Sequence, residues 1–92
     1  MNIKEFTESV IAVYLERGGE VNPDITLRLF QFIENDKELL SEYHALKGHY
    51  KEVNPRMGQT IRADFDFRNH KKVTVGSECG LLTSYTRFHK KG

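Results

Sequence analysis

Apolar residues recur at helical spacing along the front of the chain. The first stripe predicts a helix over residues 3–17, which ends before a pair of glycines. The second predicts a helix over 24–34, with Asn22 or Asp24 as its N-cap and a proline between them that suits a first turn. Each helix has one apolar face, so the pattern is typical of short helices packed around a shared core.

Another helix-start signal follows the apolar stripe of residues 24–34. Asn35 and Glu38 have the spacing of a capping box, and they predict a third helix over 36–47 that ends before a glycine. The periodicity over 24–47 also fits one long kinked helix. The local cap favours two helices, but the pattern does not decide between the two arrangements.

A further helix is predicted over 54–65, where an Asn-Pro pair again supplies a start signal. Its buried stripe consists of Met57, Ile61 and Phe65. Gly58 inside this helix costs about 0.8–1 kcal/mol relative to alanine, which suggests that another backbone approaches closely. That backbone belongs either to a packed helix or to a phosphate chain.

The helical pattern stops after Asn69, and short runs of β-branched and aromatic residues follow. They predict a hairpin over 72–88 with a glycine-bounded turn. A terminal helix over 80–88 is the competing interpretation, because the apolar residues there also fit helical spacing. We therefore expect a mostly α fold, with three to four short helices followed by a small C-terminal β-hairpin, an order that is winged-helix-like.

Length and composition restrict the class of protein further. A chain of 92 residues has room for one domain and one core, here expected over residues 1–92 with a basic tail at 89–92. The single cysteine, Cys79, excludes an intramolecular disulfide. Neither a leader-like N-terminus nor an apolar run of membrane-spanning length is present. These features predict a soluble cytoplasmic protein that does not associate with membranes.

Charge is divided unevenly along the chain. Residues 1–52 carry six Lys and Arg against ten Asp and Glu, whereas residues 53–92 carry eight against three, which together give the net charge of +1. Such asymmetry favours an anionic partner for the basic part. Attraction between the two parts of one molecule explains it equally well.

Residues that form enzymatic sites are few and poorly spaced. The four histidines lack metal-ligand spacing and Cys79 has no close cysteine or histidine, so neither a metal nor a cofactor is expected. No glycine-rich phosphate loop is present, and an ordinary solvated face explains the carboxylates around residue 36. The sequence predicts a binding protein without catalytic activity.

The outer face of the predicted 54–65 helix carries side chains that suit nucleic acid. In the major groove arginine pairs with guanine and glutamine with adenine. A helix-turn-helix domain places such a helix in that groove, and a hairpin wing can follow it. The expected nucleic-acid-binding residues are Arg56, Gln59, Arg62, Arg68, Lys71, Lys72, Arg87 and Lys90.

Two features of the sequence disagree with a helix-turn-helix domain. The segment from Lys47 to Val53 is longer than the usual turn of about 3–4 residues. Asp64 and Asp66, at the end of the helix, would also face phosphates unfavourably. Many small helical domains, moreover, carry an Arg/Gln face that binds nothing.

A sequence module in the second half resembles one found in small phage and mobile-element proteins. The family pattern is NPxIGxxI…LIxSYT, a C-terminal module of unassigned activity. The matching residues here are Asn54, Pro55, Met57, Gly58 and Ile61, followed by Leu81, Leu82, Ser84, Tyr85 and Thr86. The likeness covers about residues 35–88, implies no catalytic residues, and departs from the pattern at Met57, where isoleucine is expected.

This resemblance implies two roles. One is a compact DNA-associated regulator. The other is a phage-type, anti-CRISPR-like inhibitor that masks a host defence complex by placing acidic side chains in its basic channel. The residues expected to carry that alternative protein-binding role are Glu34, Asp36, Glu38 and Glu42.

A third hypothesis is a homo-oligomeric interaction module, with Phe30, Tyr50 and Phe67 as apolar surface off the main stripes. The charge asymmetry and the capped Arg/Gln helix both favour nucleic acid. DNA or RNA is therefore the first expected partner. A nucleic-acid-binding protein complex comes next, followed by a homodimer.

Overall fold

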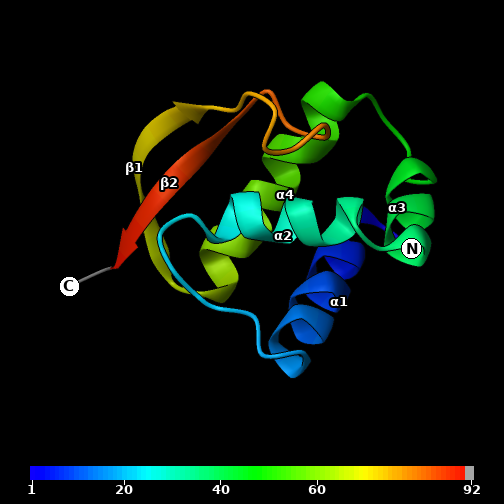
Figure 1. Ribbon diagram of the computed structural model, residues 1–92, viewed down its shortest axis with the longest axis horizontal. Coiled ribbons are helices and arrows are strands. Elements are labelled where there is room, and N and C mark those ends of the chain that lie inside the picture. The colour runs from blue at the N-terminus through cyan, green and yellow to red at the C-terminus, as the bar shows by residue number, and fades with distance from the viewer. Residues whose placement is uncertain (91–92) are drawn as a thin grey trace.

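The computed structural model describes residues 1–90, except for the side chain of Lys90. In this range the elements are α1 (Ile3–Glu16), α2 (Ile25–Glu34), α3 (Lys37–His44), α4 (Tyr50–Asp64), β1 (Phe67–Thr74) and β2 (Ser84–Lys90). The hairpin stands at one side of the helices (Figure 1). The predicted class, helices followed by a small C-terminal hairpin, is confirmed.

The segment predicted at 24–47 forms two helices rather than one kinked helix. Asp36, not Asn35, is the N-cap of α3, and its side chain accepts a hydrogen bond from the Leu39 amide at 3.0 Å. The third helix ends at His44, three residues before the predicted end. Asn35 instead closes α2 as its C-cap, so the start signal that we assigned to it lies one residue too early.

The fourth helix begins at Tyr50, four residues before the predicted start. His49 is its N-cap, and the imidazole Nδ1 accepts a hydrogen bond from the Lys51 amide at 3.2 Å. Pro55 therefore lies inside the helix, where it cannot donate to the carbonyl of Lys51 in the exposed first turn. The prediction was wrong because Asn54 is used for tertiary hydrogen bonds instead of capping.

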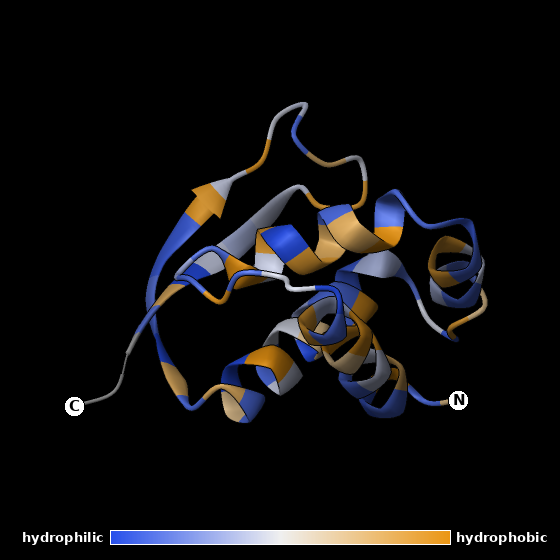
Figure 2. Ribbon diagram, turned by 60° about the horizontal axis from the view of Figure 1, so that its bottom comes forward, coloured by the Kyte–Doolittle hydropathy of each residue, from blue (hydrophilic) through white to orange (hydrophobic). Residues whose placement is uncertain are grey.

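The two strands form an antiparallel hairpin, so the competing helix over 80–88 is wrong. Its strands extend beyond the predicted 72–88, because β1 already begins at Phe67, directly after α4. A register shift between Asn69 and Lys71 marks a bulge, which leaves His70 as the extra residue. Figure 2 shows that β1 is hydrophilic over most of its length.

Every element contributes to one core. The fourth helix packs along α1, α2 packs against α3, and the hairpin contacts both α4 and α2. The predicted stripe of α4 is confirmed at Met57 and Ile61, which are buried, while Phe65 is half-buried. Phe30 and Phe67, which we expected as surface for self-association, are core residues, because the hairpin and helices cover them.

Candidate nucleic-acid interface

A groove of about 550 Å³ lies between α4 and the hairpin. We call it the α4–hairpin groove. Its walls come from α4 on one side and from β1 and β2 on the other, and Thr26 of α2 also borders it. Three cationic side chains line it, those of Lys51, Arg62 and Lys72. None of the described residues that line it is acidic.

The groove brings together three of the residues predicted to bind nucleic acid. Gln59 and Arg62 reach it from α4, and Lys72 reaches it from β1. Gly58 also lines it, and a Cβ placed there would meet no atom within 4 Å. The packed helix expected beside Gly58 is therefore absent from the described structure, and the helix backbone is instead open to the groove.

Arg56 lies on the other side of α4. There a second groove, of about 820 Å³, runs between α4, the start of α1 and the connection after α3. Lys4, Lys47 and Arg56 line it, again with no acidic side chain among the described lining residues. Gln59 lines both grooves, so this residue marks the ridge of α4 that separates two cationic hollows.

Three other predicted residues lie on the opposite face of the hairpin. Side chains alternate along a strand, and residues paired across the ladder share a face. Lys72 pairs with Thr86, and both line the groove, whereas Lys71 pairs with Arg87 on the other face of the ladder, and neither lines the groove. Arg68, paired with His89, belongs to the same face as Lys71. Residues 91–92 and the side chain of Lys90 are outside the described part of the chain.

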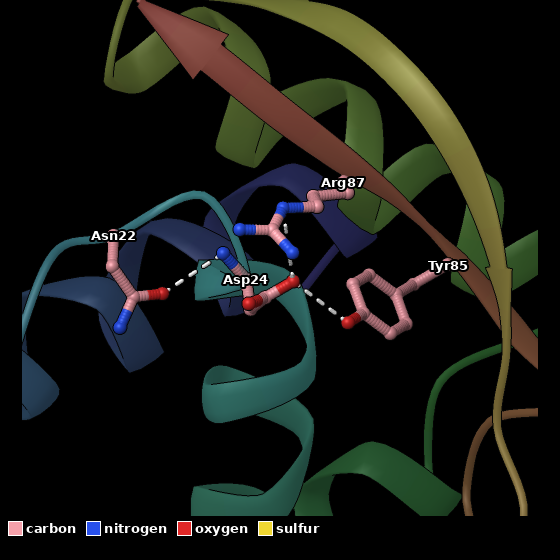
Figure 3. Close-up of polar contacts among 4 residues, drawn as sticks. All are labelled: Asn22, Asp24, Tyr85 and Arg87. Carbon is pink, nitrogen blue, oxygen red and sulfur yellow. Dashed lines mark hydrogen bonds and ion pairs between the residues drawn. The ribbon is translucent and has the colours of Figure 1, made fainter.

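Arg87 has a structural partner in the start of α2 (Figure 3). Its Nε atom lies 3.8 Å from Oδ1 of Asp24, and the hydroxyl of Tyr85 donates to the same oxygen at 2.8 Å. Phe88 donates its amide to the carbonyl of Pro23 at 2.9 Å. These contacts fasten β2 to α2, and they neutralise Arg87 where we expected it to meet phosphate.

The phenol of Tyr85 is affected by this arrangement. Burial, followed by the hydrogen bond to Asp24 and the charge of its carboxylate, raises the pKa of Tyr85 to about 12. Asp24, the N-cap residue of α2, makes no capping hydrogen bond with its side chain, since the carboxylate is engaged by the hairpin. The amides at the start of α2 therefore lack the side-chain cap that this position usually supplies.

Asn54 also lines the groove but is fully engaged in the fold. Its Oδ1 accepts a hydrogen bond from the Tyr43 hydroxyl at 2.6 Å, and its Nδ2 donates to the Leu81 carbonyl at 2.8 Å. The amide thus joins α3, α4 and the chain before β2. Both polar atoms of its side chain therefore have a partner within the fold.

Two of the four carboxylates proposed for protein binding are engaged by contacts within the fold. Glu34 accepts a hydrogen bond from the Gly80 amide at 2.7 Å. Asp36 caps α3, and its Oδ2 atom lies 3.5 Å from Nη1 of Arg17. Glu38 and Glu42 are exposed on α3, so the predicted four-carboxylate surface becomes a two-carboxylate surface.

Cys79 is buried, and burial raises the pKa of its thiol. A thiol in such surroundings stays protonated and is a poor nucleophile. The described residues contain no group of three or more His, Cys, Asp and Glu side chains able to hold a metal ion.

Most of the residues that line the groove were not predicted to bind nucleic acid, and Lys51 and Thr26 are the two that matter most for its chemistry. Lys51 lies 11 positions before Arg62, which places both on nearly the same side of an α-helix at 100° per residue. It was missed because we placed the start of the helix at Asn54. Thr26 carries no sequence signal, since only the folded chain brings α2 to this groove.

Comparisons with protein-family models, with curated proteins and with solved structures gave no match to this chain. None of the helices in the described range is both long and apolar enough to cross a membrane.

Proposed function

We propose that this protein is a small, non-catalytic nucleic-acid-binding protein, and that α4 and the adjoining hairpin form its binding surface. The observation that carries the proposal is the composition of the α4–hairpin groove, which is lined by Lys51, Arg62 and Lys72 without an acidic side chain. A concave site with charges of one sign focuses its field and concentrates polyanions. Phosphodiester chains are bound chiefly through such lysine and arginine contacts.

The rest of α4 supports the same role. A second cationic groove flanks the helix on its other side, and Gln59 lies on the ridge between the two. Its amide presents both a donor and an acceptor, the combination that reads adenine. A strand that crosses α4 would meet phosphate-binding side chains in both grooves and a base-reading side chain between them.

The surface differs from a simple helix-turn-helix. Five residues, 45–49, connect α3 to α4, which exceeds the usual turn of about 3–4 residues. The fourth helix packs along α1 and against the hairpin. We therefore assign binding to the grooves beside α4 rather than to a helix that projects alone into DNA.

The inhibitor hypothesis has less support. It requires an acidic surface for a basic channel, and two of the four carboxylates on that surface are used inside the fold. The exposed pair Glu38 and Glu42 is ordinary for the outer face of a short helix.

Lys72 and Lys71 provide the test, because they are neighbours with equal charge on opposite faces of β1. Fluorescence anisotropy with labelled DNA and RNA at about 50 mM salt, where phosphate contacts are strong, should show binding by the wild type. Lys72→Ala should weaken it about fivefold, and Lys71→Ala should leave it nearly unchanged. Absence of binding to every nucleic acid, or equal losses in both variants, would contradict the proposal.

A further inference from the structure

Thr26 is a buried polar residue whose hydroxyl has no hydrogen-bond partner. It is 4% exposed, and its Oγ1 is without a partner among the described residues. An unsatisfied buried hydroxyl costs about 1–3 kcal/mol, and native structures keep few of them without a reason. Thr26 also lines the α4–hairpin groove, so the unpaired group lies at the candidate binding surface.

The other buried threonine shows what Thr26 lacks. Thr7, in α1, donates its hydroxyl to the carbonyl of Ile3 one turn earlier, at 2.7 Å. Thr26 is the second residue of α2, so the residue four positions before it precedes the helix. That residue, Asn22, already accepts the Ile25 amide with its carbonyl. The described part of the chain therefore gives the Thr26 hydroxyl no partner, and a ligand oxygen could supply one.

The start of α2 is suited to an anionic oxygen. The positive end of the helix dipole lies there, and the side chain of the N-cap residue Asp24 does not occupy the first-turn amides. The Asp24 carboxylate is itself neutralised by Arg87 and held by Tyr85, which reduces its repulsion of an anion. Arg62 and Lys72 supply positive charge from the groove walls.

From these observations we infer that the α4–hairpin groove receives one unpaired nucleotide of a single-stranded segment, with its phosphate directed at the start of α2 beside Thr26. This inference rests on the proposed function and specifies its ligand. The hydroxyl is covered from solvent. This mode of binding therefore requires Thr26 to turn about χ1, so that the hydroxyl takes the place of the methyl group and contacts the ligand.

The small volume of the groove favours a single strand over a duplex. Its volume of about 550 Å³ is within the range of sites that enclose small molecules. A duplex keeps its backbone on a broad cylinder and would meet only the rims, whereas an unstacked nucleotide can enter.

The groove also offers groups for sugar and base. Tyr50 lines it and is 44% exposed. The centroids of the Tyr50 and His49 rings lie 4.3 Å apart, and the two rings form a platform on which a base can stack. Gln59 and Asn69 line it as well, and no hydrogen bond among the described residues uses their side chains. These amides are available for base edges.

The test compares Thr26→Val with Thr7→Val in the whole chain. Valine keeps the shape of threonine and removes the hydroxyl. The probes are labelled single strands of about 15 nucleotides, the matching duplexes, and unlabelled mononucleotides as competitors. Thermal unfolding of the free protein is measured alongside.

Thr26→Val should raise the melting temperature of the free protein, because it removes an unpaired buried hydroxyl, and should weaken single-strand binding about five- to tenfold. Thr7→Val should lower the melting temperature and leave binding unchanged, because that hydroxyl is satisfied within α1. Single strands should bind more tightly than the duplexes, and mononucleotides should compete weakly.

The outcomes separate the two levels of the proposal. Failure of all the polymers to bind would overturn the proposed function itself. Equal or tighter binding of duplexes, or unchanged single-strand binding by Thr26→Val, would overturn the single-nucleotide inference while the Lys72 result still supports nucleic-acid binding. If mononucleotides compete with the labelled probe as well as single strands do, the groove binds a free nucleotide. That result would also overturn the single-strand inference.

Discussion

At the scale of a single residue, Gly58 connects the stability of α4 with the proposed binding surface. It lies inside α4 on the surface of the α4–hairpin groove, where a methyl group would meet no atom within 4 Å. Glycine in a helix interior is disfavoured relative to alanine by its backbone entropy. No contact in the described structure requires a glycine here, so the open backbone serves the groove.

We expect Gly58→Ala to stabilise the free protein by about 0.8–1 kcal/mol, measured by urea unfolding. Gly19→Ala is the contrasting variant, because its Cβ would lie 2.5 Å from the Tyr14 ring, and it should destabilise the protein. A larger side chain at position 58 should instead obstruct ligand in the groove. Destabilisation by Gly58→Ala would show that another part of the molecule does approach this backbone.

At the scale of elements, contacts at the start of α2 attach the strand β2 that lines the groove. Asp24 binds Tyr85 and Arg87 (Figure 3). The amide of Phe88 also donates a hydrogen bond to the carbonyl of Pro23. These contacts fix the hairpin at one end, while Asn54 fixes the chain before β2 at the other. The groove is therefore a gap between elements that are tied together at its ends.

The Tyr85 contact predicts a pH dependence. Because the folded-state pKa is raised from 10.0 to about 12, the folded protein holds the phenol proton more tightly than the unfolded chain does. The contribution of this group to stability is complete below about pH 10 and is lost as the pH rises through about 12. Stability should therefore fall with rising pH in that window.

We expect Tyr85→Phe to reduce the free energy of unfolding at neutral pH by about 1–2 kcal/mol, since a hydrogen bond to a partly exposed carboxylate is lost. The difference from the wild type should narrow between about pH 10 and 12, as the wild type loses the same contact. Urea unfolding at several pH values measures both effects. Tyr50→Phe, an exposed control, should leave stability unchanged, and a Tyr85→Phe difference that stays constant with pH would contradict the linkage.

At the scale of the molecule, the fold redistributes the charge that the sequence separates. Lys51 belongs to the acidic part of the chain, yet it lines the same groove as Arg62 and Lys72. Arg68, Lys71 and Arg87 belong to the basic part, yet none of them lines this groove. Net charge by segment is therefore a poor guide to the binding surface.

This arrangement predicts the salt dependence of binding. The three cationic side chains of the α4–hairpin groove should contribute about −2 to the slope of log affinity against log salt for a single strand, at roughly −0.7 per phosphate contact. Lys51→Ala should reduce the size of that slope by about 0.7. Lys37→Ala, an exposed lysine in the first turn of α3, is the control and should leave it unchanged. If Lys51→Ala and Lys37→Ala reduced the slope equally, binding would depend only on the total charge of the protein.

Local sequence patterns determined which segments became helices and strands. The apolar period of 3.6 specified the buried faces of α1 and α4, and β-branched residues specified a hairpin near the end of the chain, because both signals depend on neighbours in sequence. Gln59, Arg62 and Lys72 were likewise predicted as binding residues from their type and position, and they line the same groove.

Tertiary structure decided how those elements meet. The sequence predicted Asn54 and Asp24 as helix N-caps, but the side chain of each bonds to residues distant in the chain. Helix α4 therefore begins at Tyr50, before Asn54, and α2 has no side-chain cap. The bulge after Asn69 set which lysine faces the groove. Thr26 borders the groove only because the fold brings α2 beside the hairpin. Hydrogen bonds, register and burial between distant segments depend on the whole fold, so local patterns do not contain them.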